Sequence, residues 1–126
     1  GPARAAFESA IGAIERDLQR QPSEPSLHAF LGRAYAGLER RDDAVREGRR
    51  AVALLPVKDD AFSGPFYLAE LAKTYARLGD ADEAIPLIRE LLAMPAGLTL
   101  SLPVLKIDPA WDPIRKDPRF EALLVE

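Results

Sequence analysis

The chain contains 126 residues, of which 48% are hydrophobic and 29% charged, and this length and balance suit one domain with a buried core. The formal net charge of −3 argues against nucleic acid or an anionic membrane as the main partner, and no apolar run reaches the roughly 20 residues that a membrane-spanning helix needs. The sequence has no cysteine and one histidine, His28, so we expect no disulfide, no thiolate chemistry, no metal site and a cytoplasmic location.

Helical periodicity dominates the chain from its start, because apolar residues recur at steps of three and four between proline and glycine breaks. These signals predict helices over 4–20, 25–39, 43–55, 65–78 and 81–93, and short helices near 101–106, 110–115 and 118–124. Residues 57–64 are either a loop or an early turn that lengthens the next helix. Residues 98–102 alternate apolar and polar side chains, but the sequence offers them no partner strand. We therefore predict an all-α fold.

Several predicted helix ends carry recognisable signals. Ser23 is a candidate N-cap for the second helix, and Asp42 or Asp43 for the third. Asp80 begins a capping box for the fifth helix. The preceding Gly79 suits the left-handed residue that often follows a helix.

Two stretches of the sequence repeat each other at a fixed offset. Tyr35 and Tyr75 are 40 residues apart, as are Ala44 and Ala84. A helix-turn-helix unit repeated at such a period is typical of a solenoid. The residues resemble the tetratricopeptide repeat, with Leu31, Gly32, Tyr35, Ala44, Ala51 and Pro56 matching in one unit and Leu71, Ala72, Tyr75, Ala84 and Pro95 in the next.

The resemblance implies an α-α superhelix of antiparallel helix pairs and divides the chain accordingly. Residues 25–58 and 65–98 would be the two repeats, joined by a connection over 59–64; residues 3–24 would be the second helix of a preceding repeat, and 99–126 a short-helical C-terminal cap. Residues 1–2, Gly-Pro, look like the remnant of a protease cleavage. We therefore expect the chain to be a piece of a longer protein.

The last unit of a solenoid has an apolar face with no neighbour and needs a cap. The candidates for this cap are Trp111, Ile114, Phe120, Leu123 and Leu124. Gly48 stands where the family often has an aromatic residue. We expect it to loosen the packing, because a glycine inside a helix costs about 1 kcal/mol relative to alanine.

The C-terminal part narrows the resemblance. Residues 58–65, 105–115 and 117–120 are similar to the ends of large bacterial signalling proteins, in which tetratricopeptide repeats follow a cyclase, Ser/Thr kinase, winged-helix or TolB-like domain. The similarity implies the regulatory or partner-binding end of such a protein, without any of those activities.

In this family the first helix of each pair lines a concave groove. The resemblance therefore implies a groove lined by Ala29, Arg33, Phe66, Ala69 and Lys73. Two cations at equivalent positions, Arg33 and Lys73, could hold a carboxylate or an acidic peptide. The family's carboxylate clamps also use asparagine, which this sequence lacks, so two solvated cations are the alternative.

Catalysis has little support in the sequence. The single histidine has no nucleophile partner at a known spacing, and glycine-rich phosphate loops and calcium loops are absent. We predict a non-catalytic protein–protein interaction module without a cofactor, whose partner is a protein or peptide. The alternative is an element that makes the parent protein a homodimer.

Overall fold

The regular elements are helices throughout the computed structural model, which describes residues 1–94 and 100–125. They are α1 (Pro2–Arg20), α2 (Pro25–Gly37), α3 (Arg41–Leu54), α4 (Gly64–Arg77), α5 (Ala81–Leu92), α6 (Leu102–Ile107), the 3-10 helix η2 (Pro109–Ile114) and α7 (Pro118–Leu123). The predicted all-α class is confirmed. Of the alternating stretch 98–102, residues 98 and 99 lie outside the described residues, as does Pro95 of the second repeat unit.

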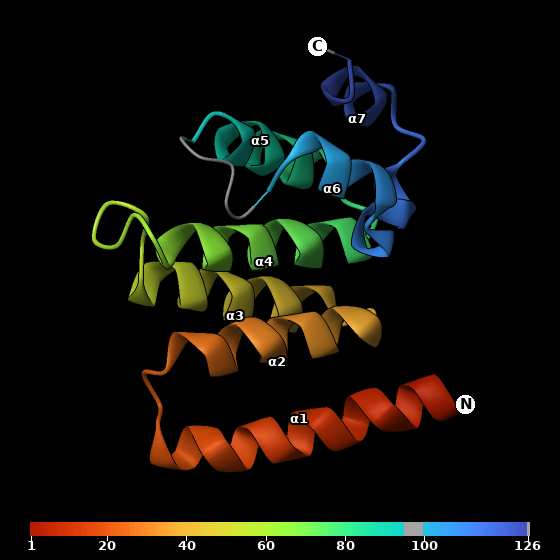
Figure 1. The fold of residues 1–126 in the computed structure, drawn as a ribbon. Helices are drawn as coiled ribbons and strands as arrows, with labels where there is room; N and C mark the ends of the chain where they lie inside the picture. Colours follow the sequence, from red (N-terminus) through yellow and green to blue (C-terminus); the bar gives the residue numbers. More distant parts are fainter. Residues whose placement is uncertain (95–99, 126) are drawn as a thin grey trace.

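The helices α1 to α5 are stacked in chain order and run in alternating directions (Figure 1). α2 packs against α1, α3 and α4, and α4 packs in turn against α3 and α5. The short helices follow at the far end of the stack, where η2 contacts α4 and α7 contacts α5. Consecutive helices therefore form antiparallel pairs.

The turns inside the two helix pairs share one geometry. Glu39 follows α2 with a φ of 60°, and Gly79 follows α4 with a φ of 75°. The next backbone amides, of Arg40 and Asp80, donate to the carbonyls of Tyr35 and Tyr75 at 3.0 and 2.9 Å. The left-handed residue at Gly79 agrees with the prediction, whereas at position 39 a glutamate adopts it.

Two of the predicted caps are wrong. Glu24, not Ser23, occupies the N-cap position of α2 and makes no side-chain cap bond, because Pro25 begins the helix without needing an amide partner. α3 begins at Arg41, so Asp42 and Asp43 lie in its first turn, where negative charge is favourable without capping.

The other two predictions about helix ends fare better. The Asp80 side chain accepts from the Glu83 amide at 3.3 Å and caps α5, as predicted. Residues 57–59 and 61–63 form turns and α4 begins at Gly64, so the connection is a loop.

The core consists of two clusters of buried side chains. One lies around Ile11, Leu31 and Tyr35, between α1, α2 and α3. The larger one joins α4 and α5 to the tail, and its largest fully buried side chains are Trp111, Tyr75, Phe120, Ile85, Ile88 and Leu105. The tail side chains Trp111, Ile114 and Phe120 thus pack into the core, while Leu123 and Leu124 lie partly buried at its edge.

Glycines allow α2, α3 and α4 to approach closely. A Cβ atom on Gly32 would lie 3.0 Å from the Ala44 carbonyl oxygen and 3.1 Å from the Gly48 nitrogen. A Cβ atom on Gly48 would lie 2.8 Å from Leu71 Cδ1. The expectation that Gly48 loosens the packing is wrong, because Leu71 occupies the space that a side chain would need.

Candidate functional site

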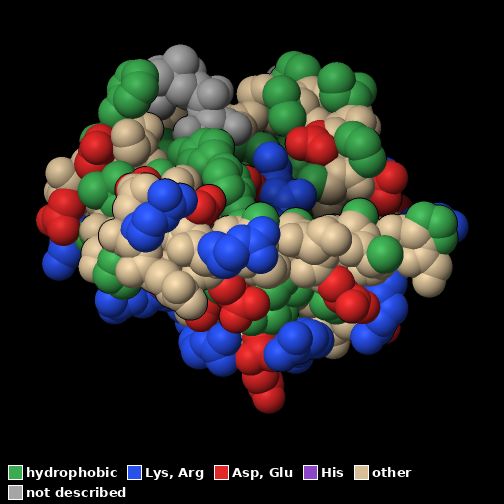
Figure 2. All heavy atoms as spheres, turned by 90° about the horizontal axis from the view of Figure 1, so that it is seen from below, with side chains coloured by type: hydrophobic (Ala, Val, Ile, Leu, Met, Phe, Trp, Pro, Cys, Tyr) green, Lys and Arg blue, Asp and Glu red, His purple; other side chains and the backbone are tan. Residues whose placement is uncertain are grey.

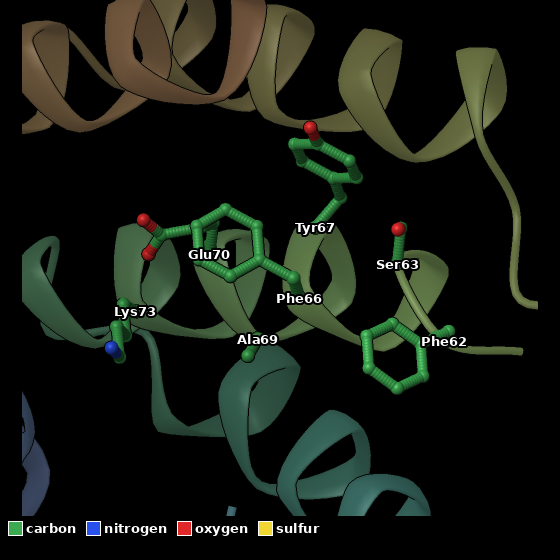
Figure 3. Close-up of a pocket in the computed structure, with 7 residues that line it drawn as sticks. All are labelled: Phe62, Ser63, Phe66, Tyr67, Ala69, Glu70 and Lys73. Atoms are coloured by element: carbon green, nitrogen blue, oxygen red, sulfur yellow. The ribbon is translucent and has the colours of Figure 1, made fainter. Parts of the chain in front are cut away.

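A hollow of about 540 Å³ opens along α4 and the loop before it. Its lining residues are Phe62, Ser63, Phe66, Tyr67, Ala69, Glu70 and Lys73 (Figure 3). Positions 66, 69, 70 and 73 follow the helical repeat, which brings their side chains to one face of α4. Seen from the α1 side, hydrophobic and basic side chains lie next to one another in a recess of the surface (Figure 2).

The loop before α4 has a defined shape that presents an aromatic side chain. Asp60 Oδ1 accepts hydrogen bonds from the backbone amides of Phe62 and Ser63, both at 2.9 Å. The amides of Ser63 and Phe62 hold the pKa of the Asp60 carboxyl below its ordinary value. A Cβ atom on Gly64 would lie 2.6 Å from Val57 Cα, so only glycine fits where the loop closes on itself. Phe62 is left 80% exposed at the edge of the hollow.

Two further aromatic rings form the wall of the hollow. Phe66 is 43% exposed and meets the Tyr67 ring edge-to-face, with centroids 5.2 Å apart. Tyr67 points toward α2 and α3 in Figure 3. Burial, with a smaller effect from the charge of Glu24, raises the pKa of the Tyr67 phenol. The wall therefore combines one exposed ring with one ring held against the neighbouring helices.

Each of the two cations predicted for the groove has a carboxylate neighbour within the chain. Arg33 Nη1 donates to Glu70 Oε2 at 2.6 Å, and the Glu70 side chain is only 11% exposed. Lys73 Nζ lies 3.8 Å from Asp108 Oδ2, which is beyond hydrogen-bonding distance. Arg33 joins α2 to α4 through its pair, while Lys73 faces the start of η2.

The predicted groove residues differ in their placement. Phe66, Ala69 and Lys73 line the same hollow, with Ala69 only 4% exposed on its floor. Arg33 reaches that hollow through Glu70. Ala29 is 1% exposed and offers almost no surface to a ligand.

A second hollow, of about 310 Å³, lies between α1, α2 and the end of α4. Its lining residues are Phe7, Ala10, Ile14, Phe30, Arg33, Ala34 and Arg77. The Arg77 guanidinium stacks over the Phe7 ring at 5.6 Å from its centroid. Phe30 is 44% exposed. This hollow is again aromatic with a basic edge.

Sequence reasoning missed Phe62, Glu70 and the second hollow. Glu70 carries a signal, because it lies three residues before Lys73 and four after Phe66 and so shares their face of the helix. Phe30 fits the apolar stripe of its helix, and nothing in the periodicity distinguishes it from a core residue. The hollow itself depends on how α1 and α4 are placed against α2, which periodicity does not report.

Other candidate groups already have partners within the chain. The His28 ring lies 2.7 Å from both Glu47 Oε1 and the Pro22 carbonyl oxygen, and it ties α2 to α3 and to the preceding turn. Arg46 pairs with Asp43 and Glu47. In the described part of the chain, no group of three or more His, Cys, Asp or Glu side chains could hold a metal ion.

Comparison with known protein families, curated proteins and solved structures gives no significant match of any kind. Within residues 1–94 and 100–125, no helix is both long enough and apolar enough to cross a membrane.

Proposed function

We propose that the chain is a tetratricopeptide-type helical repeat module that binds a segment of a partner protein along α2 and α4. The observation that carries this proposal is the hollow on α4, whose lining includes the exposed rings of Phe62 and Phe66 and the cation of Lys73. Exposed aromatic side chains are enriched at protein-binding surfaces.

Two structural features support the repeat assignment. The turns after α2 and α4 share the left-handed residue and the same amide-to-tyrosine-carbonyl hydrogen bond, 40 residues apart. α2 also contacts both its own pair partner α3 and the first helix of the following pair, α4. A stack in which each unit contacts its neighbour is the arrangement expected of a solenoid.

The residues of the hollow favour binding over catalysis. Glu70 is held by Arg33, and Ser63, the hollow's hydroxyl-bearing loop residue, has no histidine or free carboxylate as a base among the lining residues. We therefore propose a non-catalytic module without a cofactor. The resemblance noted in residues 58–65, 105–115 and 117–120 leads us to propose the cytoplasmic, partner-binding end of a bacterial signalling protein.

Self-association of the parent protein is the second candidate function. Phe62 and Ile107 are 80% and 79% exposed, and apolar side chains so exposed also fit a contact between two copies. Size-exclusion chromatography with light scattering separates the two functions. A monomer at all concentrations supports partner binding, and a tight dimer supports self-association.

The groove proposal is tested by capture of partners with a matched pair of variants. The Phe66→Ser/Lys73→Gln variant removes one exposed ring and one charge from the hollow. The Val125→Ser/Arg50→Gln variant likewise removes one exposed apolar side chain and one positive charge, at positions outside both hollows. We expect the first variant to lose a protein that the wild type captures from lysate of the source organism, and the second to retain it. Equal capture by both would refute the groove.

A further inference from the structure

One ion pair lies at the boundary between the two hollows. Arg33 lines the hollow between α1 and α2, and its Nη1 donates at 2.6 Å to Glu70, which lines the hollow on α4. A ligand that occupies both hollows must therefore pass over this pair. Each hollow is larger than one leucine or phenylalanine side chain and is walled by aromatic rings, so each suits a bulky apolar side chain.

The cations at this boundary have spare hydrogen-bonding capacity. An arginine carries five N–H donors, and Arg33 uses one of them in its bond to Glu70. Lys73 Nζ stands 3.8 Å from its carboxylate neighbour, Asp108. Arg77 stacks on Phe7 and makes no ion pair within the described ranges. The lining of the two hollows thus holds three cations and one carboxylate, Glu70, which favours an anionic group on the ligand over a cationic one.

We infer that the bound segment is extended and carries two bulky apolar side chains with a carboxylate midway between them, which Arg33 binds. This inference rests on the proposed function and specifies its ligand. One hollow lies between α1 and α2 and the other on α4, the helix that follows α2 in the groove. At about 8–10 Å per helix spacing we therefore place their centres roughly 12–15 Å apart. In an extended chain, residues i, i+2 and i+4 point to one side and the outer two are about 13 Å apart. The pattern apolar-x-acidic-x-apolar therefore matches both hollows and the ion pair between them.

The test uses a short peptide as the probe. An acetylated and amidated heptapeptide, Gly-Phe-Ser-Glu-Ser-Phe-Gly, is titrated into the nitrogen-15-labelled chain, and amide shifts are followed by NMR, which detects weak binding. Because both peptide ends are blocked, the glutamate supplies the peptide's carboxylate. The matched peptides replace the glutamate with glutamine or lysine, or place the two phenylalanines side by side.

We expect the parent peptide to shift amides of residues 30–34 and 66–73. The glutamine peptide should bind at least tenfold more weakly, and the lysine peptide and the adjacent-phenylalanine peptide more weakly still. In Arg33→Gln/Glu70→Gln, which removes both charges of the pair, the glutamate and glutamine peptides should bind equally. If that variant does not fold, Phe30→Ser and Phe66→Ser each test one hollow, and each should weaken the parent peptide at least fivefold.

Two results would overturn the inference. Equal binding of the glutamate and glutamine peptides would refute the recognition of a carboxylate by Arg33. It would not contradict the proposal that the groove binds a peptide. The absence of any amide shift in residues 30–34 and 66–73 at peptide concentrations up to millimolar would refute the pattern apolar-x-acidic-x-apolar as a whole. In either case the capture experiment with Phe66→Ser/Lys73→Gln decides the proposed function independently.

Discussion

Asp60 is the residue that fixes the position of Phe62 at the edge of the α4 hollow. Its carboxylate accepts from the amides of Phe62 and Ser63, and these bonds lower its pKa. The stabilisation is therefore present above the carboxyl's unfolded pKa of about 3.9 and is lost as the pH falls through the lower folded value.

We predict that Asp60→Ala increases the hydrogen-exchange rates of the Phe62 and Ser63 amides at pH 6, because both lose their acceptor. Asp59→Ala is the matched control, since Asp59 is exposed and accepts no hydrogen bond among the described residues. Amide exchange measured by NMR checks the difference. Unchanged rates in Asp60→Ala would show that the loop keeps its shape without the carboxylate.

At the scale of single residues, the sequence predicted the two groove cations, Arg33 and Lys73, but not the carboxylates that lie next to them. The 40-residue register identifies Arg33 and Lys73 as equivalent positions. Glu70 and Asp108 are their carboxylate neighbours in space, yet Glu70 comes from another helix pair and Asp108 from the tail. Such pairings depend on tertiary packing, which a repeat register within one chain does not specify.

At the scale of helices, three glycines in similar secondary structure meet different surroundings. Gly32 faces the backbone of α3, Gly48 faces the flexible tip of Leu71, and Gly12 has only the Arg16 side chain within 4 Å, at 3.7 Å. A backbone neighbour cannot move as cheaply as a side-chain tip, so the same substitution should have three different effects.

We predict that Gly32→Ala lowers the free energy of unfolding by about 1–3 kcal/mol through overpacking. Gly12→Ala should raise it by about 0.5–1 kcal/mol, because alanine is the better helix former and has room. Gly48→Ala should fall between them, since displacement of Leu71 offsets the helical gain. Urea unfolding of the three variants gives the order, and a stabilised Gly32→Ala would contradict the close crossing of α2 and α3.

The helices themselves were largely predictable, because each has a clear apolar stripe bounded by proline or glycine. Their exact starts were less so. Pro25 begins α2 without help from Ser23, and Arg40 takes the N-cap position of α3 although two aspartates follow it. Helix starts depend on one or two backbone angles, whereas a stripe is averaged over several turns.

At the scale of the whole molecule, the tail is part of the core of the second helix pair. η2 contacts α4, α7 contacts α5, and Trp111 and Phe120 are fully buried in their shared cluster. Both aromatic residues were predicted from the sequence to form the cap of the last helix pair. The shape of the two hollows was not predictable, because it arises from the mutual placement of α1, α2 and α4.

We predict that a chain ending at Met94 associates with itself, because the loss of the tail exposes the apolar face of α4 and α5. Size-exclusion chromatography with light scattering measures the association. Val125→Ala in the full chain is the control: Val125 is 76% exposed in the same tail, so its loss should leave the molecular mass and stability unchanged. A monomeric shortened chain that unfolds like the full one would contradict the role of the tail.

The buried indole of Trp111 also provides an optical signal. It is the single tryptophan of the sequence, it is 0% exposed, and its ring N–H has no hydrogen-bond partner among the described residues. Fluorescence from a ring so shielded shifts to longer wavelength once water reaches it. Detachment of the C-terminal segment can therefore be timed in the unlabelled protein, separately from the melting of α1 and α2.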